Sequence, residues 1–350
     1  MAENILELTG ISKEFPGVKA LSDVDISIKQ GDIHAVVGEN GAGKSTLMKI
    51  LSGVYPIGTY EGTVKFLGEE RQFSGIRDSE EAGIAIIYQE LALVKGMSIA
   101  ENVFLGNEIR KKSGVIDWNL TMQKTTSYLN EVGLDINPVT PVIKLGVGQQ
   151  QLVEIAKALS KNAKLLILDE PTAALTEAEA DNLLGIMKKL KERGVTCVFI
   201  THKLDEVFRI ADVVTVLRDG RSISTDPIGM ISKDIMISRM VGRDMTEYFP
   251  HVDHEVGDEI FRLENWTVND PELVGRKLVD DVSFSLNRGE ILGVAGLMGS
   301  GRTELAMSVF GCYRGYTSGR MFLEGREVEV KEPRDAIMLG ISYLSEDRKK

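Results

Sequence analysis

The sequence predicts an α/β fold with a largely parallel sheet, and three short apolar runs carry this prediction. Residues 33–37 (IHAVV), 165–168 (LLIL) and 196–200 (TCVFI) have the near-continuous apolar character of parallel strands buried on both faces. The first run is followed by GENGAGKST and then by a helical pattern, LMKILSGV. Strand, glycine-rich turn and helix in this order form a phosphate-binding context. Because ligands of such sheets bind beyond the carboxyl ends of the strands, the functional site is expected at that edge.

Composition places the chain among ordinary globular proteins of about two domains. It has 350 residues, of which 43% are hydrophobic and 27% charged. The apolar runs fall short of the ~18 residues that suggest a transmembrane helix, and no signal-peptide pattern opens the chain. Cys197 and Cys312 lack metal-ligand spacing and a disulfide framework, which suits a reducing cytoplasm. The net charge of −11 disfavours a general nucleic-acid surface.

A duplicated domain organises the chain. Residues 23–46 align without a gap on residues 281–304, keeping an Asp-Val pair, the Gly before the strand and three loop glycines in register. Between the copies apolar periodicity stops, and Pro, His and acidic residues collect. We therefore expect a first domain at 1–245, a linker at 246–259 and the N-terminal part of a second, degenerate domain at 260–350.

The first copy carries an intact phosphate-binding loop of the pattern G-x-x-x-x-G-K-[ST]. In such a loop the backbone N–H groups cradle phosphates, so Lys44 is expected to grip the phosphates and Ser45 to bind Mg²⁺. The expected phosphate-binding residues are Gly38, Glu39, Asn40, Gly41, Ala42, Gly43, Lys44, Ser45 and Thr46.

Acidic and histidine side chains follow the other two predicted strands. Asp169 is expected to hold Mg²⁺ and Glu170 to polarise the attacking water, because phosphoryl transfer depends on positioning and charge neutralisation. A cap for the next helix is the structural alternative for this pair. His202 is placed to hydrogen-bond a γ-phosphate oxygen or the water, although a lone histidine is more often a structural polar residue.

A helix opened by glycines is predicted within residues 145–160 (LGVGQQQLVEIAKALS). Leu152, Ile155, Ala156 and Leu159 keep the apolar spacing of one helix face. The free N–H groups and the positive dipole end at its start attract phosphate. A plain amphipathic helix after a loop explains the same pattern.

The ordered set of motifs resembles that of ATP-binding cassette (ABC) ATPases. These motifs are the intact P-loop, Gln89 in IIYQE, LGVGQ, LLILDE and then His202. The stretches GIAIIYQELALVKGMSIAENVFLGNE and GEILGVAGLMGSGRTE are similar to the tandem-cassette ATPases of bacterial monosaccharide importers, nearest the xylose and multiple-sugar members. The resemblance implies a P-loop NTPase-type cassette with a largely parallel core sheet, an antiparallel β subdomain and a helical signature subdomain, followed by a partial second cassette.

The resemblance also implies roles for individual residues. Phe15 would stack on the adenine, and Gln89 would link Mg²⁺ and the attacking water to the neighbouring helical segment. Gly146, Gly148 and Gln149 belong to the signature that closes over the γ-phosphate of an opposing cassette. Glu170, His202 and Gln89 would then be catalytic, and Ser45, Gln89 and Asp169 would hold Mg²⁺.

Four positions depart from the cassette pattern. Gly146 stands where Ser is usual and Val147 where Gly is usual, so one hydroxyl contact to phosphate is missing. Thr176 stands where Asp is common, which puts the usual cross-cassette contact in doubt. Arg302 replaces the lysine of the second P-loop, and its planar fork is a poor substitute for a compact ammonium. We expect that loop either to bind nucleotide without efficient hydrolysis or to be merely structural.

The function implied by the resemblance is ATP hydrolysis that drives monosaccharide import, with ATP and Mg²⁺ as cofactors. The implied partners are an integral-membrane sugar permease, a periplasmic or extracellular sugar-binding protein acting indirectly, and another cassette as dimer partner, with no nucleic acid. The chain would lie at the cytoplasmic face of the cell membrane. Residues 91–104 would dock the permease, although their apolar side chains equally suit the core of the helical subdomain.

The second copy stops before a signature, an acidic strand end or a switch histidine. We therefore expect a chain that is incomplete relative to the family and that alone binds MgATP but turns it over slowly. The alternatives are a soluble tandem ABC protein acting on ribosomes or nucleic acid, and a regulatory cassette without turnover. The acidic linker and Arg302 disfavour the first; Lys44, Asp169, Glu170 and His202 together disfavour the second. The sequence does not specify the sugar.

Overall fold

The computed structural model describes residues 3–242, 256–273, 275–297 and 299–345. These residues fall into two compact units, Met1–Tyr248 and Phe249–Lys350. Most of the linker that the sequence predicts lies outside the described residues.

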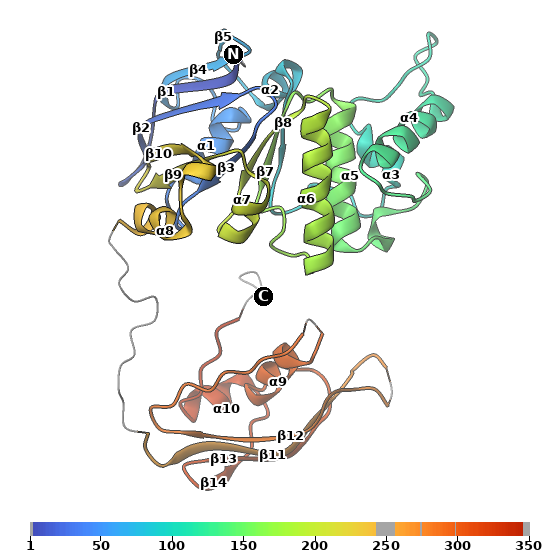
Figure 1. Ribbon diagram of the computed structural model, residues 1–350. Helices are drawn as coiled ribbons and strands as arrows, with labels where there is room; N and C mark the ends of the chain where they lie inside the picture. The colour runs from blue at the N-terminus through green and yellow to red at the C-terminus, as the bar shows by residue number, and fades with distance from the viewer. Residues whose placement is uncertain (1–2, 243–255, 274, 298, 346–350) are drawn as a thin grey trace. The chain divides into compact units, whose positions relative to one another are not determined.

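A six-stranded sheet forms the centre of the first unit, with the strand order β10-β9-β3-β8-β7-β6 (Figure 1). All its neighbouring strands are parallel except the β9–β10 pair, which confirms the predicted fold class. The strands of this sheet are β3 (Ile33–Val37), β6 (Ile84–Ile87), β7 (Leu165–Asp169), β8 (Thr196–Ile200), β9 (Val213–Arg218) and β10 (Arg221–Pro227).

A second sheet and a set of helices surround this centre. The second sheet is antiparallel, has the order β2-β1-β4-β5 and consists of β1 (Asn4–Phe15), β2 (Val18–Lys29), β4 (Glu61–Phe66) and β5 (Glu69–Arg71). The helices are α1 (Lys44–Leu51), α2 (Ile76–Ala82), α3 (Ile99–Val103), α4 (Trp118–Glu131), α5 (Val147–Ser160), α6 (Glu177–Glu192), α7 (Leu204–Ile210) and α8 (Lys233–Val241), with short 3₁₀ turns at Val142–Lys144 and Ile228–Met230.

The central sheet is apolar on both faces because each face is covered. Along β8, Cys197 and Phe199 join the apolar cluster formed with α5, α6 and α7. Val198 and Ile200 point the other way, into the cluster formed with α1 and the antiparallel sheet. All four side chains are fully buried. This two-sided burial explains why the strand reads as a continuous apolar run.

Helices α3, α4 and α5 pack against one another and form the helical subdomain (Figure 1). The predicted apolar face of α5 is buried in the core. Ile99, Ala100, Val103 and Phe104 are buried there too, so this half of the proposed docking segment is core and not surface. None of the described helices combines the length and the apolar character needed to cross a bilayer.

The second unit repeats part of the first. Its antiparallel sheet has the order β12-β11-β13-β14, which matches β2-β1-β4-β5. Asp23 and Asp281, which the alignment of the two copies pairs, both take a positive φ, of 54° and 55°. Its elements are β11 (Glu259–Asn269), β12 (Lys277–Asn287), α9 (Arg302–Val309), β13 (Thr317–Leu323), β14 (Arg326–Val328) and α10 (Pro333–Met338).

The copies differ at the strand before the P-loop. Residues 33–37 form the buried strand β3, which pairs with β8 and β9. Residues 291–295 form no strand, and Ile291 is 93% exposed. The described part of the second unit holds no parallel neighbour for this segment, so its backbone groups have no sheet to join.

Candidate active site

The loop between β3 and α1 wraps around the Lys44 ammonium group. Lys44 Nζ donates hydrogen bonds to the carbonyl oxygens of Gly38 and Glu39, at 2.7 and 2.9 Å. Burial lowers the pKa of Lys44, while the carboxylates of Glu170 and Asp169 act in the opposite direction. The ammonium group is therefore held at the centre of the loop, facing two carboxylates.

The start of α1 is shaped to receive an anion. Gly43 precedes the helix with φ 96°, and a Cβ there would lie 2.6 Å from Leu21 Cδ2 and 2.7 Å from the Ala20 carbonyl oxygen. Only glycine allows β2 to approach so closely, and the first N–H groups of α1 have no helical acceptors. These N–H groups and the helix dipole favour a phosphate group. The remaining predicted loop residues, Asn40, Gly41, Ala42, Ser45 and Thr46, lie in the same loop and first turn.

Oxygen donors suited to Mg²⁺ meet beside this loop. Asp169 is the last residue of β7, and the Ser45 hydroxyl hydrogen-bonds to its carboxylate. Burial and the Glu170 carboxylate raise the pKa of Asp169, and Lys44 and the Ser45 hydrogen bond lower it. A hydroxyl and a carboxylate next to a phosphate-binding loop fit Mg²⁺, which prefers a few oxygen ligands and substrate phosphates.

Gln89, Glu170 and His202 converge beyond the ends of three neighbouring parallel strands, β6, β7 and β8. Glu170 Oε2 accepts a hydrogen bond from Gln89 Nε2 at 3.2 Å. Glu170 Oε1 lies 3.2 Å from His202 Nδ1. The Glu170 side chain is 19% exposed and the His202 side chain 57%, so the carboxylate is sheltered while the imidazole faces solvent. The three side chains predicted to be catalytic are thus in contact, with the Glu170 carboxylate between Gln89 and His202.

Phe15, the predicted adenine-stacking residue, ends β1 in an aromatic and cationic cluster. Its ring meets the Tyr55 ring edge-on, with the centroids 5.5 Å apart. Lys13 Nζ lies 5.0 Å from the Phe15 centroid and 5.1 Å from the Tyr55 centroid, and it donates to the Thr59 carbonyl oxygen at 2.5 Å. Lys13 and Tyr55 were not predicted from the sequence. The i, i+2 spacing of Lys13 and Phe15 in a strand was the available signal, because such residues share a face.

The predicted signature residues lie at the start of α5. Gly146 N donates to Gln149 Oε1 at 3.1 Å. A Cβ on Gly148 would lie 2.6 Å from Glu179 Oε1, so a side chain at this position would require the Glu179 side chain of α6 to move. Among the described residues, no hydrogen bond joins Gly146, Gly148 or Gln149 to the P-loop or to Glu170.

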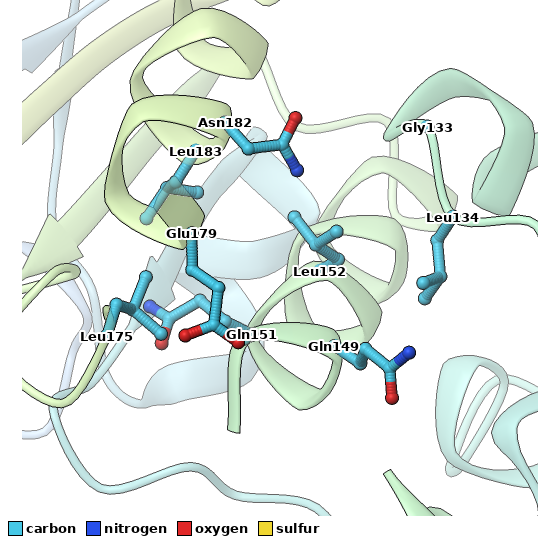
Figure 2. Close-up of a pocket in the computed structure, with 10 residues that line it drawn as sticks. Gly133, Leu134, Gln149, Gln151, Leu152, Leu175, Glu179, Asn182 and Leu183 are labelled. Atoms are coloured by element: carbon cyan, nitrogen blue, oxygen red, sulfur yellow. The ribbon is translucent and has the colours of Figure 1, made fainter. Parts of the chain in front are cut away.

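A pocket of about 170 Å³ opens beside this helix start, between α5 and α6 (Figure 2). Glu179 lines it, and its carboxylate accepts hydrogen bonds from the backbone N–H and the hydroxyl of Thr176, at 3.0 and 2.8 Å. Thr176, which stands where Asp is common in the family, therefore serves as the N-cap of α6.

The second P-loop differs from the first in its basic residue. Arg302 begins α9 as Lys44 begins α1, and Gly301 precedes it in the same left-handed conformation as Gly43. Lys44 is 7% exposed, whereas Arg302 is exposed. The loop is thus repeated, but the basic side chain is not enclosed by it.

The amino-acid sequence is similar to those of a known protein family. A family model described as ABC transporter matches residues 21–173 and 279–349. The whole chain is 57% identical to a xylose import ATP-binding protein of Thermoanaerobacter pseudethanolicus and spans 69% of that protein. It is 53% identical to an L-arabinose transport ATP-binding protein of Geobacillus stearothermophilus and spans 68% of it.

Solved structures of two cassettes resemble part of the chain. An ATP-binding cassette of an ABC transporter in its ADP conformation matches 69% of the chain and all of its own length, with 28% identity and a TM-score of 0.61. A component of an ABC transporter complex from Clostridium perfringens matches 69% of the chain and 95% of its own length, with 27% identity and a TM-score of 0.59.

Proposed function

The chain belongs to the ABC transporter family of ATPases, and we propose that it hydrolyses ATP to drive the import of a pentose such as xylose. ATP hydrolysis is supported most directly by the contacts of Gln89 and His202 with the Glu170 carboxylate, which lies next to an intact P-loop. Xylose is favoured as the transported sugar because several of the most similar relatives of this chain are named xylose import ATP-binding proteins.

The first unit would bind the nucleotide through its loop and its aromatic cluster. Lys44 would exchange its two carbonyl partners for phosphate oxygens, which a charged amine binds more strongly. The N–H groups at the start of α1 would hold the same phosphates. Phe15, supported by Tyr55 and Lys13, would stack on the adenine ring.

Ser45, Asp169 and Gln89 would hold Mg²⁺, which supplies charge neutralisation on the transferred phosphoryl group. Glu170 would accept a hydrogen bond from the attacking water and orient it toward the phosphorus atom. His202 would hydrogen-bond either that water or a γ-phosphate oxygen. Gln89 would connect this centre to the helical subdomain, because it opens the segment that leads to α3.

A second cassette would complete the site. The signature residues Gly146, Gly148 and Gln149 lie at the start of α5, and their hydrogen bonds do not join them to the P-loop of the same unit. They would close over the nucleotide of an opposing cassette, where the helix N-terminus attracts the γ-phosphate. The first unit is proposed as the complete cassette and residues 260–350 as the N-terminal part of a degenerate one.

The membrane partner would be a sugar permease bound at the cytoplasmic face of the cell membrane and supplied by an extracytoplasmic sugar-binding protein. Leu91, Leu93 and Val94 of the proposed docking segment are exposed or half-buried. A groove of about 510 Å³ also lies between α2 and the segment after α3; it is lined by Ile76, Arg77, Glu80, Glu81, Leu105, Gly106, Asn107 and Lys161. Its mixture of apolar and charged lining residues suits a short amphipathic element of the permease.

Reconstituted transport tests the proposal. Vesicles would hold the permease, with the sugar-binding protein and labelled xylose, arabinose or ribose on one side and this chain with MgATP on the other. We expect uptake of a pentose that requires ATP and is lost in Glu170→Gln. Hydrolysis without uptake of any of the three sugars would contradict the import function.

A further inference from the structure

A buried carboxylate that the proposed mechanism does not use lies behind the catalytic cluster. Glu206 is in the first turn of α7 and is 7% exposed. A carboxylate buried to this degree is stable only if its oxygens are hydrogen-bonded or paired with a cation. The partners of Glu206 therefore indicate what this residue does.

The partners come from the two turns that carry Glu170 and His202. Thr172 Oγ1 donates to Glu206 Oε1 at 2.7 Å. Thr201 Oγ1 donates to Glu206 Oε2 in a longer contact of 3.4 Å. Thr172 follows Glu170 by two residues, Thr201 directly precedes His202, and both threonines are almost fully buried. One carboxylate thus bridges the segments on which two predicted catalytic side chains are mounted.

Lys203 completes the arrangement. Its Nζ lies 3.4 Å from Glu206 Oε1 and donates to the Thr172 carbonyl oxygen at 2.9 Å. Its backbone N–H donates to Thr201 Oγ1 at 3.0 Å. The lysine balances the charge of the carboxylate and ties the same two turns together a second time.

Glu170 itself needs such support. It is a non-glycine residue with φ 45°, a conformation that persists only where the surroundings enforce it. A backbone hydrogen bond from Glu170 N to the Ile200 carbonyl oxygen, at 2.9 Å, fixes one side of the turn. The contact of Thr172 with Glu206 fixes the other side.

We propose that Glu206 is a positioning residue that locks the Glu170 turn to the His202 turn and so sets the distance between these two side chains. This inference rests on the proposed ATPase function of the same site. The hydrogen bonds and the ion pair of Glu206 lie on the side of Glu170 and His202, and none of them involves Lys44 or Ser45. Loss of Glu206 should therefore impair the chemical step and leave nucleotide binding largely intact.

The test compares Glu206→Ala, Glu206→Gln and the matched control Asp205→Asn in the full chain. Asp205 is the adjacent exposed carboxylate and pairs with Lys233 outside the cluster. We expect Glu206→Ala to lower kcat for ATP hydrolysis by about tenfold or more, because a small misplacement of catalytic groups costs this much. The KM for ATP should change by less than about twofold. Glu206→Gln, which keeps an acceptor oxygen for Thr172, should fall between Ala and wild type, and Asp205→Asn should match wild type.

A second measurement does not depend on turnover. The ring resonances of His202, assigned with a His202→Gln variant, should shift in Glu206→Ala and Glu206→Gln but stay unchanged in Asp205→Asn. Unchanged kcat and unchanged His202 resonances in both Glu206 variants would overturn the positioning role. A joint change of kcat and KM together with a fall in melting temperature would overturn it too, because Glu206 would then only stabilise the fold. A wild-type chain without any turnover would contradict the proposed function instead. The His202 resonances would still test whether Glu206 positions the His202 turn.

Discussion

At the scale of single residues, Glu170 is the residue proposed to carry most of the chemistry. Its left-handed backbone costs roughly 1–3 kcal/mol, yet this conformation accompanies a carboxylate that meets Gln89 and His202 at 3.2 Å each. Strained residues of this kind cluster at functional sites. The sequence alone predicted Glu170 as the water-activating residue, and the structure adds the partners that orient its two oxygens.

Glu170→Gln should abolish turnover without abolishing binding. The amide keeps the shape of the side chain but accepts a proton from water poorly, so hydrolysis should fall by about 10² to 10⁴-fold. The nucleotide dissociation constant should stay within about twofold, since Lys44 and the α1 N–H groups are untouched. Steady-state hydrolysis and equilibrium binding measure the two quantities. Glu177→Gln, on the exposed start of α6, is the control and should behave as wild type.

At the scale of elements, the prediction from sequence succeeded where one local pattern has few alternatives. The strands β3, β7 and β8 were expected because short apolar runs bounded by polar residues favour buried strands, and the helix α5 was expected from its apolar periodicity. The contact between Thr172 and Glu206 was not predictable, because it joins residues 34 positions apart whose local sequence contains no shared motif. Residues 291–295, which align on the strand at residues 33–37, form no strand for a related reason. A strand needs a partner, and local sequence does not supply one.

Acid should weaken the central sheet through His34. This residue of β3 is buried, its Nε2 lies 2.8 Å from Thr215 Oγ1, and burial lowers its pKa to about 4. In the unfolded chain a histidine has a pKa of about 6.5. As the pH falls from about 6.5 to 4, His34 therefore takes up a proton in the unfolded state but stays neutral in the folded state. This difference lowers the free energy of unfolding by up to about 3 kcal/mol.

Chemical denaturation between pH 7 and pH 4 measures this effect. Stability should fall less steeply in His34→Val, in which Thr215 keeps Thr225 as a hydrogen-bond partner at 2.8 Å. Equal slopes for wild type and variant would show that carboxylates alone cause the acid sensitivity.

At the scale of the whole molecule, the chain holds two units with matching antiparallel sheets, and we propose the first as the nucleotide-binding unit. Both build a four-stranded antiparallel sheet and a glycine-capped helix after the loop. Lys44 is buried in the first loop and Arg302 is exposed in the second, which supports the proposal that the first loop is the main nucleotide site. We propose that the first unit supplies the P-loop, the acidic strand end and the signature, and that its signature and P-loop serve different nucleotides.

Nucleotide binding should therefore depend on the first unit. Lys44→Ala should weaken ATP binding by at least about tenfold, because it removes a charged donor to phosphate. Arg302→Ala should change the dissociation constant by less than about twofold. Titration of each variant with a fluorescent ATP analogue gives both values. Similar losses in the two variants would mean that the second loop binds nucleotide as strongly as the first.

The most direct measurement is ATP hydrolysis per chain over a wide range of chain concentrations, with Glu170→Gln measured in parallel. Because no hydrogen bond between described residues joins the signature at α5 to the P-loop of its own unit, turnover per chain should rise with concentration as first units pair. It should be lower by about 10²-fold or more in Glu170→Gln at every concentration. Brisk turnover that is independent of concentration, or turnover in Glu170→Gln close to that of the wild type, would contradict a composite site built on Glu170.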